Sequence, residues 1–220
     1  MMKTSKYVGW MMGLVLVGAL AGCDNEPAKG AAKAVTSAVQ PVKEEPAKEA
    51  TTSTVKYKFD QAESKVQWVG AKITGKHDGG FGTFEGTIDL VDADPTKSRV
   101  SVEITMDSLT ADAEQLVGHL KSKDFFEVET YPKSRFTSTA VVAGGDGGAS
   151  HTVTGNLELH GVTKSITFPA TITVQGDTVA VKAEFAINRK DFGIVYPGKP
   201  DDLIKDDVLL RLNISAKKSQ

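Results

Sequence analysis

The chain has 220 residues, with 26 basic and 28 acidic side chains and a formal net charge of −2. A charge that is this small and mixed in sign excludes the basic stripe that a nucleic-acid-binding surface requires. A single cysteine excludes a disulfide framework, because disulfides need pairs of cysteines.

The N-terminus has the layout of a secretory signal. Lys3 and Lys6 precede an apolar run over residues 7–21, which is too short for a membrane span of about 20 apolar residues. The run ends at the sequence Leu20-Ala21-Gly22-Cys23, which resembles the bacterial lipobox. This resemblance implies that a signal peptidase cuts before the cysteine and that the cysteine sulfur receives a diacylglycerol.

The lipobox predicts where the protein resides. Residues 1–22 form the lipoprotein signal peptide, and the lipid on Cys23 anchors the chain to a bacterial membrane, facing the periplasm. Asp24, directly after the cysteine, favours the inner membrane. The alternative is a cleaved signal without lipidation, in which the cysteine occurs by chance.

Residues 23–54 are predicted to be the lipidated N-terminus followed by a disordered tether. From residue 24 onward this stretch has no aromatic residue and few apolar ones, so it lacks the buried surface that would offset its chain entropy. A flexible chain of roughly 30 residues reaches about 30 Å. Residues 55–220 are then expected to form one folded domain.

The folded part is dominated by strands with one apolar and one polar face. Apolar residues at every second position, as in Val208, Leu210 and Leu212, indicate such strands. The pattern predicts eight strands, at residues 66–73, 84–90, 100–106, 136–142, 153–159, 166–174, 179–187 and 208–216. Turn sequences such as Asp78-Gly79-Gly80 separate them. Eight amphipathic strands with mostly short connections favour an antiparallel barrel or sandwich.

The inward positions of these strands include the small residues Gly86, Gly155, Ala170 and Ala183. The interior of a closed eight-stranded barrel can hold one small ligand. Small inward residues either leave room for such a ligand or only allow the barrel to curve, and alternation does not separate these readings.

One helical stretch interrupts the strands. Thr110 or Asp112 is a candidate cap, and Leu116, Val117 and Leu120 fall on one helix face. We expect this helix to cover one end of the barrel.

Several sequence blocks resemble the YceI-like family of lipocalin-like, polyisoprenoid-binding proteins. They are GTFEGTI at 82–88, HLKSKDFF at 119–126, YPKSRF at 131–136, GNLELHGVTK at 155–164 and FG at 192–193. The resemblance spans residues 55–217. It implies an all-β fold, a single antiparallel eight-stranded lipocalin-like barrel with a short helical segment in one connection. It also implies an apolar tunnel that holds a long isoprenoid or fatty chain. The lipobox and the stretches 76–80 and 189–199 depart from the simple family form and indicate a subgroup.

These observations predict a membrane-tethered periplasmic protein that binds a long-chain amphiphile and is not an enzyme. No cofactor or metal is expected, and the oligomeric state stays open. The residues expected to hold the apolar tail are Phe84, Ile88, Val102, Ile104, Phe136, Leu157, Phe168, Ala183, Phe185 and Leu210. The candidates for contacts with the head group are His77, His119, Arg189 and Lys190.

Two other functions are compatible with the sequence. A metal- or histidine-dependent enzyme would use His77 and His119, although neither a metal-ligand spacing nor a nucleophile motif accompanies them. A barrel with a filled core would serve as an interaction or stress-protection module without a ligand.

Overall fold

The computed structural model describes residues 26–42 and 53–219. The predicted signal peptide and Cys23 therefore lie outside the described residues. The long strands are β3 (Thr54–Asp60), β4 (Lys65–Lys72), β5 (Gly75–Phe81), β6 (Phe84–Val91), β7 (Asp94–Thr105), β9 (Lys133–Ala143), β10 (His151–Leu159), β11 (Val162–Gln175), β12 (Thr178–Asn188) and β15 (Asp207–Lys218).

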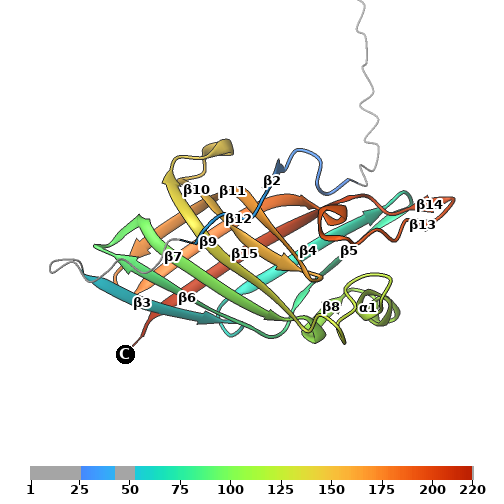
Figure 1. Ribbon diagram of the computed structural model, residues 1–220, viewed down its shortest axis with the longest axis horizontal. Coiled ribbons are helices and arrows are strands. Elements are labelled where there is room, and N and C mark those ends of the chain that lie inside the picture. The colour runs from blue at the N-terminus through green and yellow to red at the C-terminus, as the bar shows by residue number, and fades with distance from the viewer. Residues whose placement is uncertain (1–25, 43–52, 220) are drawn as a thin grey trace, which may run out of the picture.

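Antiparallel pairing closes these strands into a barrel. The ring runs from β3 through β6, β7, β9, β10, β11, β12 and β15 and back to β3. The predicted eight-stranded antiparallel barrel is confirmed. Figure 1 shows an elongated barrel with helix α1 (Glu114–Lys121) and the short ribbon of β13 (Gly198–Lys199) and β14 (Asp202–Leu203) at one end.

Three of the eight strands are broken into two pieces. β4 follows β3, β5 precedes β6, and β8 (Leu109–Ala111) follows β7. Strand β15 pairs with β4 at residues 209–213 and with β3 at residues 217–218. The outer pieces β4, β5 and β8 thus lengthen the wall at the end that carries α1.

The stretch Asp78-Gly79-Gly80 lies within strand β5, so its prediction as a turn is wrong. A Cβ on Gly79 would lie 2.2 Å from the Trp68 ring and 2.2 Å from the Thr110 carbonyl oxygen. A glycine is therefore needed here because a neighbouring ring and strand approach closely. Close approach is a common reason for glycine within a strand.

Two neighbouring strands of the ring separate along part of their length. β11 and β12 pair only where Thr171–Gln175 faces Thr178–Lys182. Beyond that point the N-terminal segment fills the seam (Figure 1), because β1 (Ala32–Lys33) pairs parallel to β12 and β2 (Val35–Ser37) pairs antiparallel to β11. We call residues 26–42 the N-terminal strap.

Side chains also fasten the strap to the barrel. Asn156 accepts a hydrogen bond from the Gln40 N–H at 3.0 Å and donates one to the Gln40 carbonyl at 2.7 Å. Lys205 donates to the Glu26 carboxylate at 2.6 Å. The prediction of a disordered tether over residues 23–54 is therefore wrong for the strap. Composition does not reveal the strap, because its partners are unpaired strand edges that exist only in the folded barrel.

Much of the barrel interior is filled by aromatic rings. Phe168 stacks on Phe185 with ring centroids 4.1 Å apart, and Phe136 packs against Phe168 at 5.8 Å. A Cβ on Gly155 would lie 2.4 Å from the Phe136 ring, and one on Gly86 would lie 2.2 Å from the Phe59 ring. These two small residues leave room for neighbouring rings and not for a ligand.

Helix α1 confirms the predicted helical segment, but it begins later than its predicted caps. Its N-cap is Ala113, which makes no side-chain capping bond. Leu116, Val117 and Leu120 pack in a cluster with Trp68, as their shared helix face predicted. Within residues 26–42 and 53–219, no helix is both long and apolar enough to cross a membrane.

Candidate functional site

The part of the interior beside α1 is hollow. A cavity of about 360 Å³ opens there between the ends of several barrel strands, α1 and the loop that follows β12. Its apolar lining consists of Val66, Trp68, Ala71, Phe81, Ile104, Met106, Leu116, Leu120, Phe125, Phe126, Leu157, Leu159, Ile187, Ile194, Tyr196, Ile204, Val208 and Leu210. This volume lies at the small end of the range for ligand sites in proteins.

Three of the ten predicted tail-binding residues line this cavity. Ile104, Leu157 and Leu210 do so, and each remains partly accessible although it belongs to the barrel's interior clusters. The other seven pack in the two clusters of the filled interior: Phe84, Ile88, Val102, Phe136, Phe168, Ala183 and Phe185. Alternation identified the inward face correctly, but it does not report which stretch of that face is hollow.

Three aromatic rings join α1 to the loop on the opposite side of the cavity. The His119 ring lies edge-on to Phe125 at 5.0 Å and to Tyr196 at 5.1 Å, and Phe125 and Tyr196 are 5.3 Å apart. All three residues line the cavity. Edge-to-face aromatic pairs are worth about 0.5–1.5 kcal/mol beyond their buried area, so this cluster holds the helix over the barrel end.

The two predicted histidines reach the same cavity from different elements. His77 lies on β5 and His119 on α1, and both line it. His77 Nδ1 is 2.8 Å from Asp112 Oδ1, and His119 Nε2 is 3.1 Å from Asp124 Oδ2. The hydrogen bond from His77 lowers the pKa of the Asp112 carboxyl below its ordinary value. Each histidine therefore has its own carboxylate partner.

Arg189 is buried and bound to its own protein, with only 4% of its surface exposed. Its guanidinium donates to the carbonyls of Ile194 at 2.7 Å, Lys205 at 3.1 Å and Ile204 at 3.4 Å, and it also reaches the Asp206 carboxylate at 3.4 Å. Burial lowers the pKa of the Arg189 guanidinium below its ordinary value. Arg189 also lines the cavity. Because its donors are bound to the loop at the mouth, it holds that loop in position, and its contact with a head group stays a prediction.

Lys190 lies outside the cavity lining. It is exposed and pairs with Asp206 at 2.9 Å. The amines that do line the cavity belong to Lys72, Lys199 and Lys205. Of these, only Lys199 lies in the basic stretch 189–199 that the sequence offers for a head group, and Lys72 and Lys205 were not predicted. Lys72 ends β4, and Lys199 and Lys205 lie in the loop that Arg189 organises. Lysines at strand ends and in loops are common, so charge alone did not distinguish Lys72 and Lys205.

In the described part of the chain, no group of three histidine, cysteine, aspartate or glutamate side chains is placed to hold a metal ion. His77 and His119 each pair with one carboxylate, Asp112 and Asp124.

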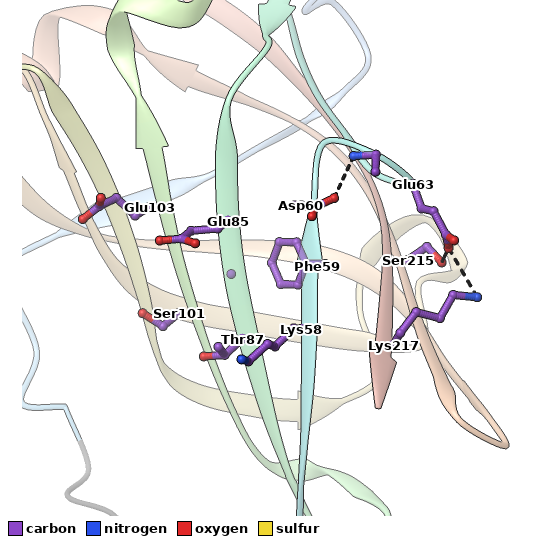
Figure 2. A pocket seen from close by; sticks show the side chains of 12 residues that line it. Lys58, Phe59, Asp60, Glu63, Glu85, Thr87, Ser101, Glu103, Ser215 and Lys217 are labelled. Carbon is purple, nitrogen blue, oxygen red and sulfur yellow. Dashed lines mark hydrogen bonds and ion pairs between the residues drawn. The ribbon is translucent and has the colours of Figure 1, made fainter. Parts of the chain in front are cut away.

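A second hollow, of about 600 Å³, lies over β3, β6, β7 and β15 (Figure 2). Most of its lining is charged or hydroxylated, including Lys58, Glu85 and Glu103. Some of these charges pair within or beside the hollow, as Lys217 does with Glu63 at 3.3 Å. Because most of these side chains carry a charge or a hydroxyl, the hollow suits an apolar chain less well than the cavity beside α1, which is therefore the candidate site.

Comparisons with known proteins agree with this architecture. The model of the YceI-like domain family matches residues 57–216. A UPF0312 protein of Pseudomonas putida strain W619 is 36% identical over 136 residues, which cover 59% of this chain and 70% of the relative.

Two solved structures share the fold. Burkholderia cenocepacia BcnA has a TM-score of 0.63 and 24% identity, covering 72% of this chain and 99% of that one. A polyisoprenoid-binding domain from Saccharophagus degradans, implicated in plant cell wall breakdown, has a TM-score of 0.59 and 15% identity, covering 76% and 100%.

Proposed function

Because this chain belongs to the YceI-like domain family, we propose that it is a non-catalytic, membrane-tethered periplasmic binding protein for an amphiphile with a long apolar tail. The observation that carries this proposal is the apolar cavity inside the barrel, where Ile104, Leu157 and Leu210 remain accessible. A barrel that served only as an interaction module would have no need of this hollow.

The tail needs no directed polar contact. Burying each methylene is worth about 0.8 kcal/mol, and the cost of association removes several kcal/mol of the sum. A tail of about ten carbons therefore supplies enough free energy for binding by apolar contact alone. The polyisoprenoid-binding domain of Saccharophagus degradans, which shares the fold, supports an isoprenoid tail as one candidate.

The polar end of the amphiphile would lie at the mouth. His77 and His119 line the cavity together with Lys72, Lys199 and Lys205. Lys72 and Lys205 are paired with Asp202 and Glu26, so Lys199 and the two histidines are the groups that suit a phosphate or carboxylate head group. Arg189 and Lys190 are not included, because the first is bound to main-chain carbonyls and the second lies outside the lining.

The cavity limits how much of a long tail enters. About 360 Å³ is the space for a small ligand, and the stacked rings of Phe168 and Phe185 fill the interior beyond it. A longer tail would therefore either leave its remainder outside the barrel or separate these rings.

The membrane anchor is part of the same proposal. The lipobox supports lipidation of Cys23, a periplasmic location and, through Asp24, the inner membrane. Fractionation of cells tests this: Cys23→Ser should move the protein from the membrane fraction to the periplasmic fraction. A mutant that is retained on membranes as completely as the parent after signal cleavage would refute the anchor.

Native mass spectrometry after gentle extraction tests the cargo. The expected spectrum contains the chain with one bound amphiphile whose mass identifies it. A spectrum of the bare chain, together with no uptake of added long-chain lipid, would contradict the proposed function.

A further inference from the structure

Three exposed aliphatic side chains surround the mouth of the cavity. Ile73, Val195 and Leu203 keep 53%, 62% and 45% of their surface exposed. Their neighbours in the chain line the cavity, namely Lys72, Ile194, Tyr196, Asp202 and Ile204. Ile73, Val195 and Leu203 are themselves outside the cavity lining, so they lie beside the mouth without entering the cavity. We call Ile73, Val195 and Leu203 the apolar rim.

The rim belongs to segments that meet at one end of the barrel. The Ile73 N–H donates to the Leu203 carbonyl at 3.1 Å, and Lys72 and Ile204 form an antiparallel bridge. Figure 1 shows the tips of the β4–β5 hairpin and the β13–β14 ribbon projecting together at this end. Two of the rim residues are therefore adjacent on a projecting tip.

The charged groups around the rim are largely paired with each other. Lys72 pairs with Asp202, Lys190 with Asp206 at 2.9 Å, and Lys205 with Glu26 at 2.6 Å. This pairing leaves no strong net charge of either sign beside the aliphatic side chains. A partner for the rim is thus selected by apolar contact.

The N-terminal strap leads to the same place. The Glu26 carboxylate is bound by Lys205, which itself lines the cavity. Cys23 precedes Glu26 by three residues, and three residues span at most about 10 Å. If Cys23 carries the lipid, as the proposed function holds, the strap keeps its anchor close to the cavity mouth.

We propose that the apolar rim inserts into the surface of the lipid bilayer, so that the cavity mouth faces the membrane. An apolar tail then passes between bilayer and barrel without crossing water, which would oppose its transfer. This inference rests on the proposed function, because that proposal supplies the lipid anchor. In place of a barrel held at a distance by a flexible tether, it puts the barrel directly on the membrane surface.

Single-cysteine labelling tests this orientation in the full, lipidated chain. Cys23 is the only cysteine, so Leu203→Cys adds the only free thiol when Cys23 carries lipid. An environment-sensitive fluorophore on this thiol is measured in phosphatidylcholine vesicles that contain a lipid-linked quencher. Val142→Cys is the matched control, because Val142 is 59% exposed and lies on β9, outside the cavity lining. We expect strong quenching at position 203 and little at position 142, whereas equal quenching would overturn the proposal.

Vesicle flotation of a chain without its anchor provides a second test. In a Cys23→Ser background, the double variant Ile73→Asp, Leu203→Asp should float with phosphatidylcholine vesicles at least about fivefold less than Val142→Asp, because it places charge where apolar surface is buried. Equal recovery of the two variants with the vesicles would overturn the proposal that the apolar rim inserts into the bilayer. A failed anchor shows itself separately, because the parent chain then takes up the thiol label.

Discussion

At the scale of single residues, Arg189 holds the loop that forms one side of the cavity mouth. Its guanidinium donates hydrogen bonds to three buried or partly buried main-chain carbonyls, which would lose this partner without it. Arg189→Ala should therefore lower the free energy of unfolding by about 3 kcal/mol, since each unsatisfied buried group costs about 1–3 kcal/mol. Urea denaturation measures the loss.

Lys190→Ala is the matched control for Arg189, because both side chains pair with Asp206. Lys190 is exposed, and exposed ion pairs contribute at most about 1 kcal/mol. If the two variants lost the same stability, the carbonyl contacts of Arg189 would not be the source of its effect.

Asp202 joins the β13–β14 ribbon to the tip of the β4–β5 hairpin. It accepts hydrogen bonds from Lys72 and from the Thr74 main-chain N–H and hydroxyl, at 3.0 Å for the latter two. The hydrogen bond from Lys72, followed by those from Thr74, lowers the pKa of the Asp202 carboxyl below its ordinary value. A carboxyl with a lowered pKa in the folded state stabilises the fold above its ordinary pKa of about 3.9, and this stabilisation is lost as the pH falls through the folded-state pKa.

Asp202→Asn should therefore be less stable than the parent at neutral pH, with a difference that shrinks as the pH falls below about 4. Urea denaturation at a series of pH values measures this difference. A gap that stayed constant down to strongly acidic pH would show that the carboxylate charge contributes nothing.

At the scale of elements, the N-terminal strap completes the barrel wall. The Ala34 N–H donates to the Ala186 carbonyl at 2.8 Å within the seam. Ala34→Pro removes this donor and should lower the free energy of unfolding by about 1–3 kcal/mol, because the Ala186 carbonyl then lacks a partner. Thermal or urea denaturation gives the value.

Ala38→Pro is the control for the strap, because Ala38 is exposed and lies just beyond β2. It should leave stability nearly unchanged. A disordered tether would make both proline variants neutral, and that result would contradict the inserted strap.

The strands show how far hydrophobic alternation extends. All eight predicted strands are present, because each buries one face of a two-residue period in the barrel. The same rule applies to β3, where Val55, Tyr57 and Phe59 alternate with polar residues. That strand could therefore also have been predicted from the sequence. Strand β5 could not be predicted in this way, because its sequence GKHDGGF has no apolar alternation. Its Gly79 is required by the close approach of the Trp68 ring, which the sequence does not show.

The site was predictable only in outline. His77 and His119, both singled out from the sequence, line one cavity, and they reach it from strand β5 and helix α1. Arg189 lines the cavity, but the sequence does not show that its charge is buried and bound to carbonyls. The strap was missed because its stability depends on edges contributed by residues more than a hundred positions away.

At the scale of the whole molecule, the barrel is part filled and part hollow. Ile88 is 2% exposed in the filled part, whereas Ile104 lines the cavity. Ile88→Phe should cost about 1–3 kcal/mol of unfolding free energy by overpacking, whereas Ile104→Phe should cost much less, because it expands into empty space. Equal losses in urea denaturation would contradict the hollow.

The central claim, that the cavity takes an apolar chain, is tested most directly by titrating the protein with fatty acids of increasing length. Trp68 lines the cavity, and the only other tryptophan, Trp10, lies in the predicted signal peptide, so tryptophan fluorescence reports occupancy. Affinity should rise about fourfold for each added methylene, which corresponds to about 0.8 kcal/mol, and should level off once the cavity is full. Ile104→Phe should shift that limit to shorter chains. Affinity that did not depend on chain length, or no saturable change in fluorescence, would contradict the account.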